Sequence, residues 1–277
     1  MYSPEANPTG RAAPRVITPQ TPARPSRWLS RSMTTRLLSI GLLILFWFGL
    51  AYGLDDPDTL PGPIAVAGLI AGEWANGELM RHLSATLLRV AAAFVLAMAI
   101  GTALGLFMGR RPGANRWLDA WLVVFLNIPA LVTIVLAYLW IGLNEVAAIA
   151  AVALNKIPMV TVMLREGARA LRPELDDMAR VFRMTPMERL RHVILPQLAP
   201  HIAAAARTGV ALIWKIVLVV EFLGRSNGVG FQIHLYFQLF DIGMVLAYAA
   251  AFIVIMLVIE TLILQPLERH ARRWRDV

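Results

Sequence analysis

The chain has 277 residues, of which 58% are hydrophobic and only 16% are charged, and it contains no cysteine. Soluble globular chains have roughly 45–50% apolar and about 25% charged residues, so this composition excludes an ordinary soluble domain. The absence of cysteine excludes disulfides, thiolate metal sites and cysteine nucleophiles. The net charge of +8 comes largely from short basic segments between apolar runs, which is typical of a multispanning membrane protein and not of a nucleic-acid-binding protein.

The chain begins with a segment, residues 1–33, that holds six prolines and five arginines and almost no apolar run. Such a stretch cannot bury enough apolar surface to offset the entropy lost on ordering. It also lacks the apolar core and cleavage site of a signal peptide. The sequence therefore predicts a disordered cytoplasmic tail, followed by a transmembrane domain over residues 34–277.

Apolar runs follow, and a membrane-spanning helix needs about 20 such residues. They cover about residues 37–54, 85–108, 118–143, 146–164, 202–223 and 242–264. We therefore expect an all-α integral membrane protein with six transmembrane helices.

The charge of the connecting segments predicts the orientation of these helices. The tail, residues 110–116, residues 165–191 and residues 269–275 are basic, whereas the loop over residues 55–78 carries five carboxylates, against which only Arg81 stands nearby. Lysine and arginine gather on the cytoplasmic side, where Trp28, Trp117 and Trp274 would flank the spans. Both termini are thus expected in the cytoplasm.

The second expected span carries Gly101, Gly105 and Gly109, one small residue every four positions on a single helix face. This spacing allows two helices to approach closely in lipid. Packing within one subunit is the first interpretation, and a seam between two subunits is the alternative.

Residues 165–200 form a long basic segment that is more regular than a simple connector. Pro173 suits the first position of a helix, with acidic residues in the first turn. Thr185 and Glu188 have the spacing of a capping box before a second helix, which Pro196 and Pro200 would end. Two short amphipathic helices on the cytoplasmic surface would form a docking device that transmits force from a partner.

Several motifs in and around this segment resemble the permeases of binding-protein-dependent ABC importers. Asp177-Met178-Ala179, Arg183 and Val193-Ile194-Leu195-Pro196 are similar to the family's Glu-Ala-Ala…Gly…Ile-x-Leu-Pro loop. Similar motifs elsewhere are Leu60-Pro61-Gly62-Pro63, His82 with Ser84 and Arg89, Gly105 to Gly109, Ile128-Pro129, Leu139 to Gly142, Glu221 to Gly224, and Ser226 to Gly230. The branch that transports nitrate, sulfonates and taurine is the most similar.

The sequence departs from the family pattern at some of these positions. Arg183 stands where the family has glycine, so the bend there is expected from Thr185-Pro186 instead, because arginine adopts positive φ at a cost. Ala130 stands where the branch has a second proline, which weakens any assignment of the substrate.

The resemblance implies the small (type I) ABC importer permease fold in a bacterial inner membrane. It also implies a complex of two permeases, two cytoplasmic ATPases and one periplasmic binding protein. It implies a non-catalytic subunit without a cofactor, because the partner binds ATP. The ATPase-coupling residues would be Asp177, Met178, Ala179, Arg183, Leu195 and Pro196. The solute would be a small anion such as a sulfonate or nitrate. A channel and an intramembrane hydrolase are the alternatives.

Lys156, Lys215, Glu221 and Glu260 are ionisable residues within or near the expected spans. Charges at that depth mark pathways or mutual pairs. Since the charges balance, two structural Lys–Glu pairs are the first interpretation, and a transport pathway lined by Lys156, Lys215 or Glu221 is the second. Pro129 and Pro158 are expected to break helices in mid-span, either as pathway lining or as simple kinks.

Overall fold

The computed structural model describes residues 26–266, and every regular element in that range is a helix. The α-helices are α1 (Ser26–Leu54), α2 (Pro63–Ala75), α3 (Glu78–Arg110), α4 (Pro112–Asn127), α5 (Ala130–Ile141), α6 (Glu145–Arg169), α7 (Pro173–Val181), α8 (Pro186–Arg189), α9 (Leu195–Gly224), α10 (Val229–Gln238) and α11 (Ile242–Ile259). Two π-helical turns, η1 (Leu190–Ile194) and η2 (Glu260–Leu264), adjoin α9 and α11. The predicted all-α class is confirmed.

The chain divides between Gly49 and Leu50 into two compact units. The first unit contains most of α1, which begins at Ser26, inside the segment expected to be a tail. Its start follows the last proline of that segment, Pro25, after which no proline interrupts the helix. The rest of the expected tail, together with Trp274 and the basic residues 269–275, lies outside the described residues.

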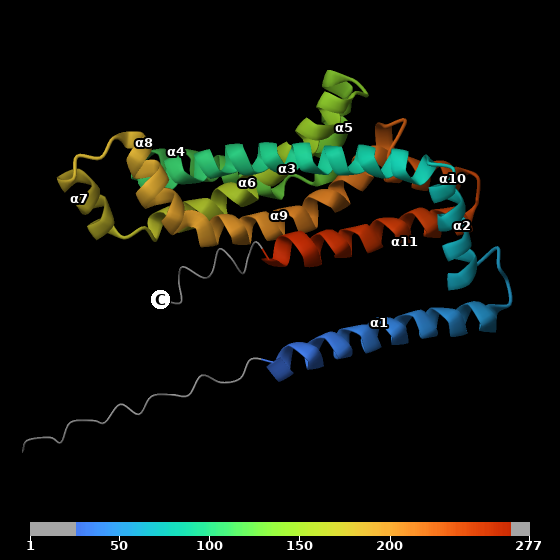
Figure 1. Ribbon diagram of the computed structural model, residues 1–277. Coiled ribbons are helices and arrows are strands. Elements are labelled where there is room, and N and C mark those ends of the chain that lie inside the picture. The colour runs from blue at the N-terminus through green and yellow to red at the C-terminus, as the bar shows by residue number, and fades with distance from the viewer. Residues whose placement is uncertain (1–25, 267–277) are drawn as a thin grey trace, which may run out of the picture. The chain divides into compact units, whose positions relative to one another are not determined.

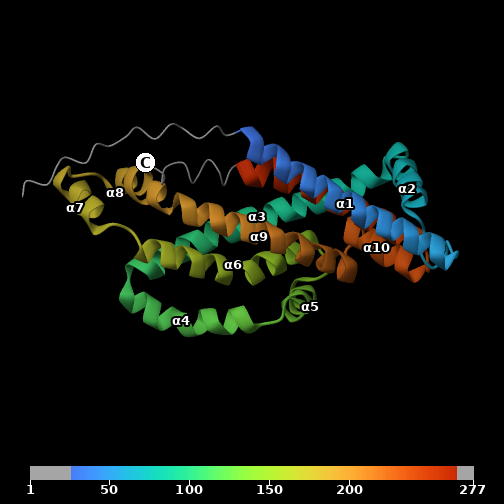
Figure 2. The same cartoon turned by 90° about the horizontal axis from the view of Figure 1, so that it is seen from below.

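In the second unit, α3, α6, α9 and α11 run lengthwise as the body of the molecule (Figure 1). The short helices α7 and α8 lie at one end of this body, whereas α2 and α10 lie at the other (Figure 2). The structure therefore has two distinct ends, and the predicted coupling segment occupies one of them.

Four described helical segments are long and apolar enough to cross a membrane: Glu78–Arg110, Glu145–Arg169, Pro186–Gly224 and Ile242–Ile263. A fifth span is formed if α4 and α5 are taken together, although they meet at an angle of 94°. The apolar part of α1, Leu38–Leu54, is shorter. At about 1.5 Å per residue it covers less than the roughly 30 Å of a bilayer core. The six expected transmembrane helices are thus not all confirmed.

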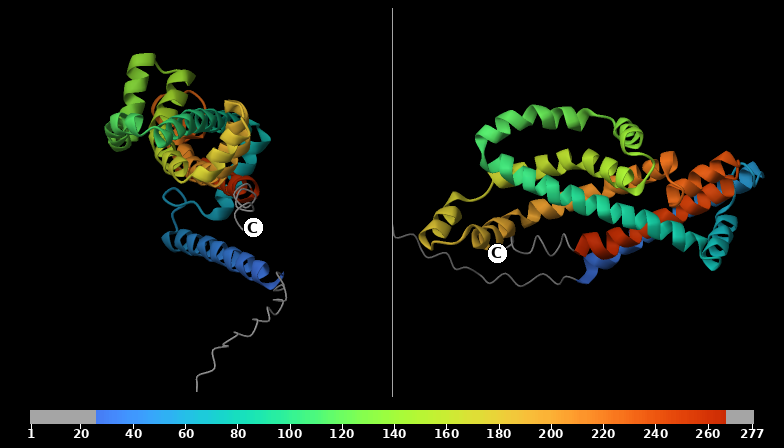
Figure 3. Two further views of the ribbon diagram at one scale, coloured as in Figure 1. Left: turned by 90° about the vertical axis from the view of Figure 1, so that its left-hand side faces the viewer. Right: turned by 90° about the horizontal axis from the view of Figure 1, so that it is seen from above.

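Proline has different effects in the two spans where a break was expected. Pro129 lies between α4 and α5, so the third expected span is broken and bent there, as expected (Figure 3). Pro158 lies inside α6, which continues through it, so the expected break is absent. Pro158 is buried and α6 packs against α3, α5 and α9, which hold the helix together despite the missing hydrogen bond.

The glycine stripe of α3 is the reason that α3 and α6 lie so close together. A Cβ atom added at Gly101 would lie 2.6 Å from Val160 Cβ, and one at Gly109 would lie 2.6 Å from Ala168 Cβ. No real Cβ atom tolerates such distances, so only glycine allows this approach. The small residues therefore serve packing within one subunit, which was the first interpretation.

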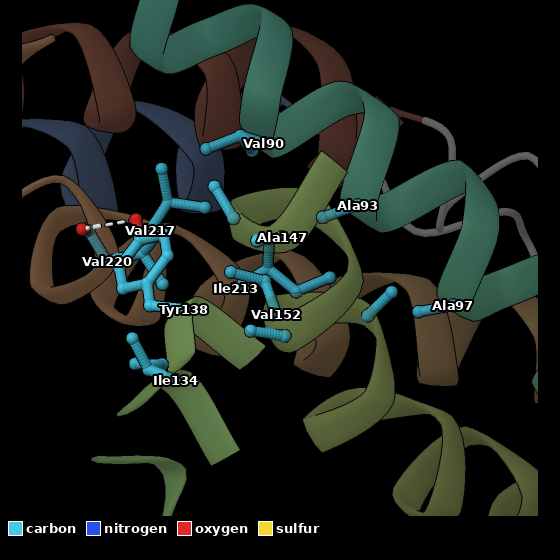
Figure 4. Close-up of a cluster of buried hydrophobic side chains, with 13 residues drawn as sticks. Val90, Ala93, Ala97, Ile134, Tyr138, Ala147, Val152, Ile213, Val217 and Val220 are labelled. Atoms are coloured by element: carbon cyan, nitrogen blue, oxygen red, sulfur yellow. Dashed lines mark hydrogen bonds between the residues drawn. The ribbon is translucent and has the colours of Figure 1, made fainter. Parts of the chain in front are cut away.

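The largest cluster of buried apolar side chains joins α3, α5, α6 and α9 (Figure 4). Small residues of α3 and α6 meet branched residues of α9 there, which matches helix packing in membranes. Tyr138 of α5 lies in the same cluster and donates a hydrogen bond of 2.9 Å to the carbonyl oxygen of Val220. This bond satisfies the buried hydroxyl and fixes the short helix α5 against α9.

Candidate functional site

The coupling segment, residues 165–200, contains the end of α6, all of α7, α8 and η1, and the start of α9. Pro173 stands in the first turn of α7, as predicted, and the first turn also carries Glu174 and Asp176. Thr185 and Glu188 form the predicted capping box, in which the Thr185 hydroxyl accepts from the Glu188 N–H and the Glu188 carboxylate accepts from the Thr185 N–H at 2.8 Å. The local sequence therefore determines where both helices begin.

The second helix of this segment does not end at Pro196. Instead α8, η1 and α9 run on as one helical segment of 39 residues, Pro186–Gly224, in which Pro200 is also internal. The N–H of Leu195 donates to the carbonyl oxygen of Leu190, one residue further back than in an α-helix. This π-turn admits Pro196, which has no N–H, without a break. A movement of α8 would thus be carried directly into a membrane-spanning helix.

Asp176 joins this segment to the body of the molecule. Its carboxylate forms ion pairs with Arg189 of α8 and with Arg110 at the end of α3, the latter at 3.0 Å. The hydrogen bond from Arg189 holds the pKa of Asp176 below its usual value. Asp176 is therefore ionised at neutral pH and ties α7 to α8 and α3.

The predicted coupling residues are exposed, with one exception. Met178 and Leu195 are about 40% exposed, and Asp177, Arg183 and Pro196 are also on the surface. Ala179 is buried and cannot contact a partner directly, so it shapes the segment from within. The most exposed apolar side chains of the coupling segment are Val181 (79%), Phe182 (70%) and Met187 (70%). These three were not identified as coupling residues from the sequence.

A buried polar cluster lies at the other end of the second unit. At its centre Arg89 of α3 donates to Glu221 of α9 at 2.6 Å and to both carboxylate oxygens of Glu145 at 2.6 and 2.7 Å. The Arg89 guanidinium also donates to the side-chain oxygen and to the backbone carbonyl oxygen of Asn227. Glu145 in addition accepts a bond of 2.5 Å from Arg225. These bonds link α3, α6, α9 and the loop before α10.

The loop before α10 fits closely onto Glu221. Gly230 N–H and the Thr86 hydroxyl both donate to Glu221 Oε2 at 2.9 Å, and Gly228 N–H donates to His82 Nδ1 at 3.0 Å. Gly228 has φ +110°, and a Cβ atom there would lie 2.4 Å from the Glu221 carboxyl carbon. Only glycine can occupy this position.

The expected Lys–Glu pairs are not formed. Glu221 pairs with Arg89, because that guanidinium reaches it from the facing helix, and Glu260 lies 3.9 Å from Arg207. Among residues 26–266, neither Lys156 nor Lys215 has an ion-pair partner. Lys156 is buried in α6, whereas Lys215 lies on the exposed surface of α9. Arg89 also pairs with Glu145, the first residue of α6.

The bend between α4 and α5 encloses a cavity of about 250 Å³ against α6. Its lining is mainly apolar and includes Ile128, which precedes Pro129, and Asn155, which precedes Lys156. Pro129 therefore creates the bend that forms the cavity wall, and a polar side chain reaches the space from α6.

Comparison with known families identifies this arrangement. Residues 101–275 match the family described as binding-protein-dependent transport system inner membrane component. The chain belongs to this family. The match covers the end of α3, all helices from α4 to α11 and the coupling segment, so the structure described above is that of a membrane permease component of an ABC transport system, and not of an enzyme.

Relatives within this family extend the similarity over most of the chain. The aliphatic sulfonates transport permease protein SsuC of Bacillus subtilis is 28% identical over 87% of this chain and 87% of its own. The taurine transport system permease protein TauC of Escherichia coli is 27% identical over 90% of this chain and 92% of its own. The bicarbonate transport system permease protein CmpB of Synechococcus elongatus is 29% identical over 54% of each chain. The predicted branch of the family is thus confirmed.

Solved structures share the fold at lower identity. A chain of the inward-facing MetNI methionine ABC transporter matches with a TM-score of 0.58 and 19% identity over 68% of this chain and 93% of that chain. A chain of a bacterial ABC transporter involved in the import of alginate matches with a TM-score of 0.61 and 16% identity over 89% and 96%. The predicted permease fold is confirmed.

Proposed function

We propose that two copies of this permease form a transport path for a small anion. Cytoplasmic ATPases dock on the coupling segment, and a periplasmic binding protein delivers the solute. The observation that carries this proposal is the exposed apolar surface of Val181, Phe182 and Met187. It lies at the far end of the body from α10. Large apolar side chains that are exposed next to charged ones are typical of protein interfaces.

The connection from this surface to the membrane supports a mechanical role. Helix α7, which leads into this exposed apolar surface, is held to α8 by the ion pair between Asp176 and Arg189. Helix α8 then continues through η1 into α9. A rigid-body movement of docked ATPases would therefore tilt or shift a membrane-spanning helix, which is a common way to switch a transporter. ATP itself would bind to the partner and not to this chain.

The position of Lys215 supports the proposed pairing of two permease subunits. It is exposed in the single chain and lies about two and a half turns from the end of α9, on a stripe with Thr208, Val219 and Leu223. A lysine at that depth is costly against lipid and instead faces protein or water. We infer that this stripe faces the path between two permeases, where the cation attracts an anionic solute.

The orientation follows from the two ends of the molecule. The coupling end carries the basic segments 110–116 and 165–191, whereas the opposite end carries the acidic loop over residues 55–78. By the distribution of lysine and arginine the coupling end is cytoplasmic. The binding protein would then meet the end that holds α2 and α10, and both termini would be cytoplasmic.

The relatives suggest the class of solute. They are named for aliphatic sulfonates, taurine and bicarbonate, each of which carries a small anionic group. Lys156 is buried without an ion partner among the described residues, and it directly follows Asn155, which lines the cavity. The stability of a buried cation requires a partner, and a passing anion would supply one.

Docking is tested by removing the apolar surface. We expect the double variant Val181→Ser/Phe182→Ser to lose copurification with the ATPase of the same transport system, with unchanged thermal unfolding of the permease. Leu239→Ser is the matched control, because Leu239 is similarly exposed (63%) at the opposite end. Retention of the ATPase by the double variant would disprove docking at this surface.

A further inference from the structure

The last turn of α7 ends at a residue whose backbone conformation is unusual for its type. Arg183 has φ +48°, in the left-handed region that glycine favours. Its N–H donates to the Arg180 carbonyl oxygen at 3.0 Å, and the next N–H, that of Met184, donates to the Ala179 carbonyl oxygen at 3.0 Å. The helix is thus closed by a glycine-type cap in which an arginine occupies the glycine position. This differs from the expectation that Thr185-Pro186 would supply the bend.

An arginine at this position carries a conformational cost that glycine would avoid. Nothing in the described chain compensates that cost, since the Arg183 guanidinium is exposed and forms no hydrogen bond or ion pair within residues 26–266. The Arg183 side chain therefore makes no contact within the described chain that would stabilise α7, and it is free to contact another molecule.

The neighbouring carboxylates are already engaged. Asp177 pairs with Arg180 at 3.2 Å, Asp176 pairs with Arg189 and Arg110, and Glu188 completes the cap at Thr185. The cation at the tip is consequently uncompensated. In the sequence it follows Val181 and Phe182 directly and precedes Met187 by four residues, and all three of these apolar side chains are exposed. A guanidinium next to aromatic and aliphatic side chains is the composition of an interface hot spot.

We infer that Arg183 selects the ATPase partner of this permease: the docking groove of that ATPase presents an apolar floor to Val181 and Phe182 and a carboxylate to Arg183. This inference rests on the proposed docking of an ATPase at the coupling segment. A planar guanidinium bonds a carboxylate through two parallel hydrogen bonds, which gives geometric selectivity that glycine lacks. An ATPase without that carboxylate would leave the guanidinium without a partner at the interface.

The test compares variants of Arg183 in the purified permease and in its complex with the ATPase. For Arg183→Gly we expect an equal or higher midpoint of thermal unfolding, because the strained backbone is relieved, together with affinity for the ATPase that is lower by about tenfold or more. Arg183→Asn tolerates the same backbone and should behave similarly. Arg180→Gln is the control, because Arg180 is also exposed but already pairs with Asp177.

The outcomes separate this inference from the proposed function. Undiminished affinity of both Arg183→Gly and Arg183→Asn, with affinity lost in Val181→Ser/Phe182→Ser, would overturn the role of Arg183 and leave the docking surface intact. Undiminished affinity in all three variants would overturn the docking surface as well. Restoration of Arg183→Glu binding by an acidic-to-lysine change in the ATPase groove would identify the carboxylate directly.

Discussion

At the scale of single residues, steric fit and buried charge explain most of the structure. The Gly101, Gly105 and Gly109 stripe was recognisable in the sequence because small residues at a spacing of four have one strong use in membranes. The partner helix could not be predicted, since the sequence does not indicate which element faces the stripe. Similarly, Glu221 and Arg89 were identified separately, but their contact depends on the packing of α3 against α9.

Gly105 gives a direct test of the close approach between α3 and α6. A Cβ atom at Gly105 would lie 2.7 Å from both Leu164 Cβ and the Thr161 carbonyl oxygen. Because the backbone cannot yield easily, we expect Gly105→Ala to lower the free energy of unfolding by about 1–3 kcal/mol. Gly113→Ala is the control, since a Cβ atom there meets nothing within 4 Å. Equal thermal unfolding midpoints in detergent for the two variants would contradict the packing described.

The buried ion cluster around Arg89 predicts how strongly each of three substitutions lowers the free energy of unfolding. Arg89→Met leaves the buried carboxylate of Glu221 without a cation and should cost about 3–5 kcal/mol. Glu221→Gln leaves Arg89 paired with Glu145 and should cost less, about 1–3 kcal/mol. Arg81→Met removes an exposed pair with Glu78 and should cost less than about 1 kcal/mol. Denaturant unfolding of the three variants would reveal a different order if Arg89 does not hold the cluster together.

At the scale of elements, local signals predicted how helices begin better than how they end or join. The capping box at Thr185 and the first turn at Pro173 depend on neighbouring residues only, and both were predicted correctly. The continuity of α8, η1 and α9 was missed, because a π-turn that accommodates Pro196 has no distinctive sequence signal. The positive φ of Arg183 was missed for the opposite reason, because arginine is a residue type that rarely adopts it.

The ion pairs of Asp176 can be tested by comparing a substitution at Asp176 with the same substitution at Asp177. We expect Asp176→Asn to weaken the attachment of α7 by about 1–2 kcal/mol, because it removes a charge-assisted bond to Arg189. Hydrogen exchange should then accelerate over residues 173–182, with little change in the spans. Asp177→Asn, which alters only an exposed pair, should leave exchange nearly unchanged.

The same contact has a defined dependence on pH. The pKa of Asp176 is lower in the folded chain than its ordinary value of 3.8, so the contact contributes its full stabilisation above that pH and loses it as the pH falls through the lowered pKa. Exchange over residues 173–182, corrected for the intrinsic pH dependence of exchange, should therefore be constant from neutral pH to about pH 5. A loss of protection already near pH 6 would show that another group controls α7.

At the scale of the whole molecule, composition was sufficient to predict a membrane protein, and the alternation of basic and acidic segments predicted its orientation. The number of spans was harder to predict, because hydropathy does not distinguish one straight helix from the bent pair α4 and α5. The sequence also gave no direct signal for the cavity that the bend creates against α6, since a cavity depends on three elements at once.

The orientation can be measured with single cysteines, because the chain has none of its own. A membrane-impermeant maleimide added outside the cell should label Asp58→Cys and should not label Gly113→Cys. Both positions are exposed, so reactivity reports the side of the membrane. Labelling of Gly113→Cys in intact cells would reverse the proposed orientation.

Lys215 tests the proposed path between two permeases. We expect Lys215→Met to assemble normally with the ATPase and to reduce uptake of an anionic solute by about tenfold, corresponding to about 1.4 kcal/mol. Lys215→Arg keeps the charge and should retain most of the uptake. Normal uptake by Lys215→Met would remove Lys215 from the path, and failure to assemble would indicate a structural role in the subunit interface.

The most direct measurement reconstitutes the purified permease in vesicles with the ATPase and the binding protein of its transport system and follows uptake of a labelled sulfonate. We expect uptake only when the permease, the ATPase and ATP are present together, and we expect Val181→Ser/Phe182→Ser to abolish it. Solute flux through the permease alone, at the same rate with and without ATP, would show a channel and contradict the central claim.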